Sequence, residues 1–306
     1  MTRQPVREGR GMVEAIPVKW RLEATILRLL LWGFGLLGVE RASAMGGAIA
    51  RVVGPKLGVN KRAAHNLKLI FPDITDEALA RITREMWENL GRTAAEYAHL
   101  DKFDPYREGG RILVRNLDRL DDLLTEGRGV IFVGGHLGNW ELQTIAAARK
   151  GIPVMAVYRA ANNVLVDALI ADLRARHVTP DLAPKGATGA RQLVGWLKQG
   201  KSVAMLVDQK MNDGIAAPFM GRMAMCAPAP AQLARRFGCP ILPAMIRRTA
   251  GAQFEIVLGE PVYVAQSDDR DADLLAAITA YNSQLEAFIR RYPGQWLWLH
   301  RRWPES

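Results

Sequence analysis

A histidine and a glutamate that could act together stand in the run Gly134-Gly135-His136-Leu137-Gly138-Asn139-Trp140-Glu141. The run follows residues 129–133, an apolar stretch typical of a buried strand, and leads into residues 142–150, a predicted helix closed by Gly151. The glycines predict a turn, with Asn139 as N-cap and Glu141 in the first helical turn, where the helix dipole keeps it ionised. If the turn folds His136 against Glu141, one imidazole nitrogen is held and the other can take a proton from a hydroxyl. The run therefore predicts a general-base dyad without a serine or cysteine nucleophile nearby.

A base of this kind can take the proton of a hydroxyl, so that the hydroxyl oxygen attacks a carbonyl carbon. The tetrahedral oxyanion formed in that step needs fixed hydrogen-bond donors. The backbone N–H groups of Gly134, Gly135 and Gly138 are the candidates, because they flank the histidine in the chain.

The pattern of a histidine, four residues and an acidic residue after a strand resembles the signature of the lysophospholipid acyltransferase superfamily. The wider chain resembles one branch of it, the late lipid A acyltransferases (lauroyl and myristoyl transferases) of Gram-negative bacteria. The matching segments run almost from end to end: Arg62, Asn66-Leu67, Phe71-Pro72, Met86-Trp87, Asn89, Gly91-Arg92, Glu96, Tyr158-Arg159, Asn162-Asn163, Val207-Asp208-Gln209, Pro218-Phe219, Gly221, Ala224, Pro228-Ala229 and residues 295–303.

The resemblance implies a secondary acylation in lipopolysaccharide biosynthesis. The acceptor would be a Kdo-bearing, acylated glucosamine disaccharide phosphate, and the donor an acyl carrier protein thioester or acyl-CoA. In such relatives an Asp-Gln pair lies beside the acceptor site, which assigns Asp208 and Gln209 to substrate binding. From the residues alone, Asp208 is equally well a carboxylate at a strand end.

Three basic residues are further candidates for substrate binding. Arg159 follows a predicted strand, and a guanidinium suits the bidentate recognition of phosphate, although a lone arginine is often only a solvated surface group. Lys185 and Arg191 flank a Gly-Ala-Thr-Gly stretch and could hold a phosphate or the phosphopantetheine arm of a carrier.

The composition of the 306-residue chain favours an anionic partner, because the formal net charge is +10. Anionic lipid headgroups or an acidic carrier protein fit better than nucleic acid, since the chain has no recognisable nucleic-acid-binding motif. We expect no metal and no cofactor. The two cysteines, Cys226 and Cys239, have no metal-binding spacing and are interpreted as small buried side chains in a reducing compartment.

Residues 24–39 form an apolar run that is interrupted only by Arg28. A cleaved signal peptide is disfavoured by the long segment before the run, and a membrane span by its length and by the basic residues on both sides, among them Arg3, Arg7 and Arg10. We favour a helix that lies in the cytoplasmic leaflet of the inner membrane, with an ordinary core helix as the alternative. The predicted division is a membrane-associating segment over residues 1–45 and a catalytic domain over residues 46–306 that faces the cytoplasm.

Strands are predicted at residues 112–114, 130–133, 154–157, 203–207, 241–246 and 254–258. Helices are predicted between several of them, at residues 164–177, 190–198, 229–237 and 274–291, and one precedes them at residues 76–99. This alternation predicts a single α/β domain with a largely parallel sheet covered by helices on both faces. Ligands of such sheets bind at the carboxyl ends of the strands, where His136 and Asp208 would lie.

Three other functions remain open at this stage. The acceptor could be a phosphatidylinositol mannoside, an ornithine lipid or a lysophospholipid. The base could instead activate water, as in a thioesterase or esterase. A membrane-surface protein without catalytic activity would not need the histidine and its carboxylate.

Overall fold

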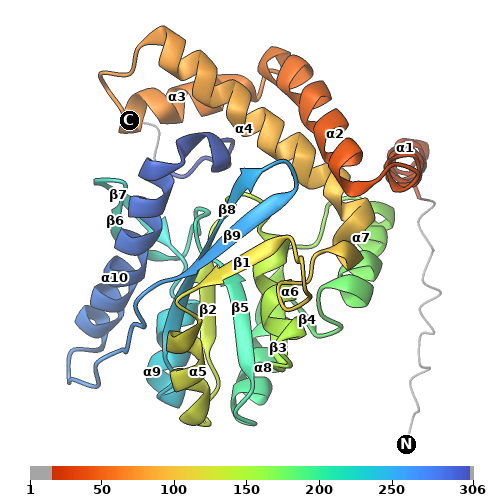
Figure 1. Ribbon diagram of the computed structural model, residues 1–306. Coiled ribbons are helices and arrows are strands. Elements are labelled where there is room, and N and C mark those ends of the chain that lie inside the picture. Colours follow the sequence, from red (N-terminus) through yellow and green to blue (C-terminus); the bar gives the residue numbers. More distant parts are fainter. Residues whose placement is uncertain (1–15, 304–306) are drawn as a thin grey trace, which may run out of the picture.

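The protein is described by a computed structural model that covers residues 16–303, and its centre is a seven-stranded sheet (Figure 1). The strands stand in the order β1-β9-β8-β2-β5-β3-β4, and every neighbouring pair is parallel except β8 and β9. Their bounds are β1 Ile112–Arg115, β2 Ile131–Gly134, β3 Val154–Tyr158, β4 Leu182–Pro184, β5 Ser202–Leu206, β8 Ile241–Ala250 and β9 Gln253–Leu258. The predicted α/β class and the largely parallel sheet are confirmed.

The central strand β2 shows why the sheet is covered on both faces. Ile131 and Val133 point to one face and join the core formed with helices α8, α9 and α10, whereas Phe132 points to the other face and joins the core formed with α5 and α6. The bounds of these helices are α5 Leu117–Thr125, α6 Glu141–Arg149, α8 Ala187–Leu197, α9 Ala229–Phe237 and α10 Arg270–Arg291.

A layer of helices crosses one end of the sheet and lies above it in Figure 1. It consists of α2 Val39–Val53, α3 Asn60–Ile70 and α4 Asp76–Glu96. Helices α2 and α4 approach closely at Gly46 and Gly91. A Cβ on Gly46 would lie 2.5 Å from the carbonyl oxygen of Gly91, and one on Gly91 would lie 2.3 Å from the carbonyl oxygen of Gly46. Glycine at both positions is therefore a packing requirement.

The apolar run over residues 24–39 is not one helix, which corrects the prediction. Helix α1 spans Val18–Gly35, a turn follows at residues 36–38, and α2 begins at Val39. Helix α1 packs beside α7 (Val164–His177), whose N-cap Asn163 donates to the carbonyl oxygen of Trp20 at 3.0 Å. Residues 1–15, with Arg3, Arg7 and Arg10, lie outside the described part of the chain.

Helix α1 exposes an unusual amount of apolar surface. Only Ala24 is buried, whereas Trp32 is 66% exposed and Leu29 is 61% exposed. Within residues 16–303, no helix combines the length and the hydropathy needed to cross a bilayer.

The chain between β5 and α9 forms a separate two-stranded hairpin. Strands β6 (Ile215–Phe219) and β7 (Arg222–Cys226) are joined by Met220 and Gly221, both with positive φ. Phe219 is buried in the core at this hairpin.

The tryptophans of the C-terminal segment are all buried. Helix α10 is followed by η3 (Pro293–Gln295), and Trp296, Trp298 and Trp303 come after it. These rings therefore pack in the core of the protein.

Candidate active site

The candidate site is built where β2 and β5 end. These strands are parallel neighbours, with Gly134 opposite Leu206, so the residues that follow them emerge at the same edge of the sheet. Nδ1 of His136 lies 2.8 Å from Oδ1 of Asp208, and the backbone N–H of His136 donates to Oδ2 of the same carboxylate at 2.7 Å. Asp208 thus holds both the ring and the backbone of the histidine.

The Asp208 carboxylate is completely enclosed and still ionised. Its second oxygen also accepts the indole N–H of Trp296 at 2.7 Å. Burial alone raises the pKa of a carboxyl group, but the positive charge that His136 carries when protonated and the hydrogen bonds from His136 and Trp296 outweigh burial and hold the pKa of Asp208 well below its usual range. An ionised carboxylate only accepts hydrogen bonds, so the proton between the two residues sits on Nδ1 of His136. The other nitrogen, Nε2, is then the atom that can take a proton.

The predicted pairing of His136 with Glu141 is not present. Glu141 begins α6, as predicted within one residue, but its carboxylate accepts from the hydroxyl of Tyr97 at 2.5 Å and from the guanidinium of Arg174 at 2.5 and 3.0 Å. Burial lowers the pKa of Arg174, but the Glu141 carboxylate more than reverses this, and the pKa lies above its ordinary value. The carboxylate is turned towards α7 and the end of α4 because Arg174 binds both of its oxygens there. The ring of His136 is bound by Asp208 instead.

Gln209 and His300 complete the surroundings of Nε2. The side-chain nitrogen of Gln209 lies 3.1 Å from Nε2 of His136 and 2.9 Å from Nε2 of His300. The two imidazole rings are 5.5 Å apart between centroids, and the indole of Trp140 lies 5.1 Å from the ring of His136 on another side. Burial, followed by the charge of His136, lowers the pKa of His300 from 6.5 to about 4, so His300 is neutral at physiological pH.

The glycines of the turn serve packing first. The N–H of Gly138 donates to the carbonyl oxygen of Gln295 at 3.1 Å, which corrects its assignment as an oxyanion donor. The carbonyl oxygen of Gly138 accepts from Asn89 and Thr93 of α4, each at 2.9 Å. A Cβ on Gly135 would lie 3.2 Å from Oδ2 of Asp208, so the absence of a side chain there allows the carboxylate to reach the backbone of His136.

The basic candidates follow the neighbouring strands of the same sheet edge. Arg159 comes directly after β3 and Lys185 directly after β4, and both side chains are exposed. The positive charge of Arg159 contributes to the lowered pKa of His300, as does that of Arg62 from α3. Arg191 is exposed on α8. In the described part of the chain, no hydrogen bond, ion pair or ring contact joins the side chains of Arg159, Lys185 or Arg191 to His136 or Asp208.

Several residues at the site escaped the sequence analysis. Trp296 and His300 lie near the end of the chain, and only their position within the matching segment at residues 295–303 could have drawn attention to them. Tyr97 and Arg174 carry no local signal, because their partner Glu141 is distant in sequence. The position of Glu141 in the first turn of a predicted helix gives no reason to look for these two partners.

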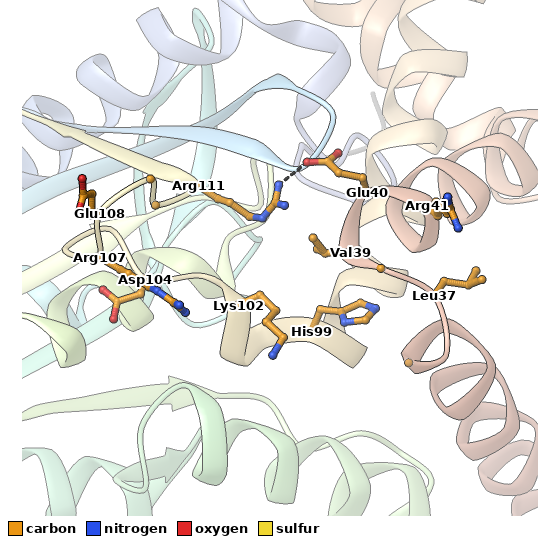
Figure 2. A pocket seen from close by; sticks show the side chains of 14 residues that line it. Leu37, Val39, Glu40, Arg41, His99, Lys102, Asp104, Arg107, Glu108 and Arg111 are labelled. Atoms are coloured by element: carbon orange, nitrogen blue, oxygen red, sulfur yellow. Dashed lines mark hydrogen bonds and ion pairs between the residues drawn. The ribbon is translucent and has the colours of Figure 1, made fainter.

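A separate cavity of about 760 Å³ lies between the end of α1, the start of α2 and the chain before β1 (Figure 2). Its lining mixes arginine and lysine side chains with carboxylates, and Glu40 is paired with Arg111 across it. His136, Asp208 and Gln209 do not line this cavity, so the chemistry, rather than the size of a hollow, identifies the candidate site.

Comparisons with known proteins identify the family of the chain. A family model described as bacterial lipid A biosynthesis acyltransferase matches residues 16–305. A lipid A biosynthesis palmitoleoyltransferase from Escherichia coli (strain K12) is 28% identical over 247 residues, which cover 78% of this chain and 77% of that protein. A lipid A biosynthesis lauroyltransferase from the same organism is 28% identical over 244 residues, or 78% of this chain and 76% of that protein. A lipid A biosynthesis acyltransferase from Shigella flexneri is 28% identical over 247 residues, with 78% and 77% covered.

Proposed function

Because the chain belongs to the bacterial lipid A biosynthesis acyltransferase family, we propose that it moves a fatty acyl chain from a thioester to a hydroxyl of a lipid A precursor, with His136 as the general base. The predicted family and the predicted enzyme class are confirmed. The observation that carries the mechanism is the contact between Nδ1 of His136 and Oδ1 of Asp208 at 2.8 Å, because it leaves Nε2 as the proton acceptor.

The reaction then proceeds by a single displacement. Nε2 of His136 takes the proton of the acceptor hydroxyl while the hydroxyl oxygen forms a bond to the thioester carbonyl carbon. The C–S bond breaks as the tetrahedral intermediate collapses, and the thiolate leaves with the proton that His136 carried. The products are an ester and a free thiol. Asp208 stabilises the imidazolium that exists between the two proton transfers.

Glu141 does not bind the base, and its role is a different one. By holding Arg174 and Tyr97, Glu141 fixes the start of α6 and thereby the turn that carries His136. We propose that it is a positioning residue. Gly134 lies within β2, opposite Leu206 of β5, so its N–H belongs to the ladder of the sheet and is not available to an oxyanion. The N–H of Gly135 is proposed as a donor to the oxyanion, in the manner of fixed backbone donors in acyl-transfer enzymes.

The acceptor is proposed to be a Kdo-bearing, acylated glucosamine disaccharide phosphate. The names of the relatives specify lipid A biosynthesis, and Arg159 and Lys185 stand along the same sheet edge as His136, where their charges suit phosphate groups. Arg191, on the first turns of α8, would extend this basic surface.

We propose that helix α1 binds the cytoplasmic face of the inner membrane and so brings the site to its lipid acceptor. Its large apolar side chains are exposed along the helix, with Lys19 and Arg21 exposed beside them, which is the composition of a helix that lies in a membrane interface. The exposed apolar residues of α2, including Ile49 and Val52, extend the same surface. An acyl carrier protein or acyl-CoA would deliver the donor chain from the aqueous side.

The test is an acylation assay on the detergent-solubilised full chain. The protein is incubated with Kdo₂-lipid IV_A and a panel of acyl carrier protein and CoA thioesters, and mass spectrometry detects one added acyl group. His136→Ala should abolish the product, whereas His65→Ala, a matched change of an exposed histidine on α3, should not. Consumption of the thioester with release of free fatty acid, and no acylated lipid, would contradict the proposal and indicate hydrolysis.

A further inference from the structure

The nitrogen that must accept the proton is covered in this structure. The side-chain nitrogen of Gln209 sits 3.1 Å from Nε2 of His136, in the place where an acceptor hydroxyl has to bind. Since Nδ1 of His136 carries the proton shared with Asp208, neutral His136 can only accept at Nε2, and Gln209 must present its NH₂ group there.

His300 determines where this NH₂ group stays. The second N–H of Gln209 points to Nε2 of His300 at 2.9 Å, so both donors of the amide are engaged by the two imidazole rings. His300 is itself anchored, because its backbone oxygen accepts from Asn66 of α3 at 2.7 Å. The charged or titratable groups that face His300 are His136, Asp208, Arg62 and Arg159, and burial together with the nearby cations keeps His300 in the neutral form that can accept a hydrogen bond.

We propose that His300 is a positioning residue that holds the amide of Gln209 over Nε2 of His136 and so keeps water from the general base until the lipid acceptor arrives. The proposal rests on the proposed function, because it assumes that His136 activates a hydroxyl. When the acceptor hydroxyl replaces the contact between Gln209 and His136, Gln209 keeps its hydrogen bond to His300. Its released N–H can then donate to the hydroxyl oxygen while the hydroxyl proton points to Nε2.

The consequence is a bias between two reactions of the same thioester. In transfer, the acceptor oxygen bonds to the carbonyl carbon, the C–S bond breaks, and the products are an ester and a thiol. In hydrolysis, a water oxygen bonds to that carbon, one water proton passes by way of His136 to the thiolate, and the products are a fatty acid and a thiol. When the amide no longer covers Nε2, access to the base increases more for a small water molecule than for a bulky lipid, so hydrolysis increases relative to transfer.

The experiment measures how the wild-type full chain and its variants partition acyl carrier protein thioester between acylated Kdo₂-lipid IV_A and free fatty acid. His300→Leu and Gln209→Ala should each raise the ratio of hydrolysis to transfer about tenfold, the effect of losing one hydrogen bond to a reacting group. His300→Gln should restore a low ratio, because its amide oxygen can accept the N–H of Gln209. Trp298→Phe is the matched control: it removes a hydrogen bond to the carbonyl oxygen of Pro293 in the same C-terminal segment without touching Gln209, and it should leave the ratio unchanged even if the overall rate falls.

Two results would overturn the inference while leaving the proposed function intact. One is a low, unchanged ratio in His300→Leu and Gln209→Ala although both still transfer acyl chains. The other is a ratio that rises equally in Trp298→Phe, which would indicate general loosening of the segment. A wild-type chain that transfers no acyl group at all would instead refute the proposed function.

Discussion

Asp208 reaches His136 from 72 positions further along the chain and binds both its ring and its backbone N–H, at 2.8 and 2.7 Å. Glu141, only five positions away from the same histidine, binds Arg174 and Tyr97 instead. The two carboxylates therefore divide the work. Asp208 determines which ring nitrogen of His136 carries the proton, and Glu141 holds the start of the helix that follows His136.

The role of Glu141 predicts a strong energetic coupling with Arg174. Glu141→Gln should lower the free energy of unfolding by roughly 2–4 kcal/mol, somewhat less than for a fully enclosed pair because 20% of the Arg174 side chain is exposed. Arg174→Gln should lower the free energy of unfolding by about as much. The double variant should lower it little more than either single variant, because each single change already leaves one charge without its partner. Chemical denaturation of the four proteins measures this cycle.

The matched control for this cycle lies on the same helix. Arg176 and Asp172 of α7 form an ion pair with side chains that are 57% and 55% exposed. Arg176→Gln and Asp172→Asn should each change the free energy of unfolding by less than about 0.5 kcal/mol. A Glu141–Arg174 coupling as small as that of the control pair would refute the positioning role.

The lowered pKa of His300 predicts how stability depends on pH. In the folded chain this pKa is about 4, below the 6.5 of an unhindered histidine, so between these values the unfolded chain binds more protons than the folded one. The contribution of His300 is therefore fully present above pH 6.5 and is lost as the pH falls, with a slope of up to about 1.4 kcal/mol per pH unit. Denaturation curves at pH 7 and pH 5 should show this loss in the wild type and a smaller loss in His300→Gln. Equal losses in both proteins would contradict the assignment, and the exposed His65→Gln serves as the control.

The sequence was sufficient to predict six of the seven strands of the sheet and insufficient to predict the partners of the base. All six predicted strands exist. The central parallel strand β2 is buried throughout and is recognised as a continuous apolar run, whereas β9 alternates between buried and more exposed residues. The spacing from His136 to Glu141 suggested a local pair, but the partner of a side chain at a strand end is decided by which strand lies alongside. Here that strand is β5, which brings Asp208 to the site. The sequence analysis placed Asp208 at the correct edge and assigned it to the substrate instead.

Other elements were missed for identifiable reasons. The hairpin of β6 and β7 turns through Met220 and Gly221, and a methionine with positive φ is not the Asn-Gly or Asp-Gly pair that marks such turns. The short strand β4 has only three residues, of which the last is Pro184. The break between α1 and α2 falls inside a continuous apolar run, where no change of hydropathy marks it.

The exposed face of α1 predicts binding to membranes. Replacing Leu29 and Trp32 together by serine removes two large apolar side chains, which are 61% and 66% exposed, from the proposed interface. The affinity for anionic phospholipid vesicles should fall by tenfold or more, because burial of each chain in the interface contributes about 1.5–3 kcal/mol. Vesicle sedimentation measures it.

The control for α1 uses exposed apolar residues elsewhere. Leu275→Ser changes a side chain on α10 that is 37% exposed, and Tyr263→Ser changes one that is 56% exposed and donates to Glu126. Helix α10 lies across the molecule from α1 in Figure 1. This variant should bind vesicles as the wild type does. If both double variants bind equally well, α1 is not the membrane-binding element.

The most direct test of the account is the single-turnover rate of acyl transfer in Asp208→Asn, at saturating acyl carrier protein thioester and Kdo₂-lipid IV_A. An asparagine keeps the size of the side chain but loses the negative charge that holds the proton on Nδ1 of His136. The rate should fall roughly 10²- to 10⁴-fold, the range that general-base catalysis supplies, with Asp122→Asn on the exposed face of α5 as the unaffected control. A folded Asp208→Asn protein that transfers acyl chains at close to the wild-type rate would contradict the assignment of His136 and Asp208 as the catalytic pair.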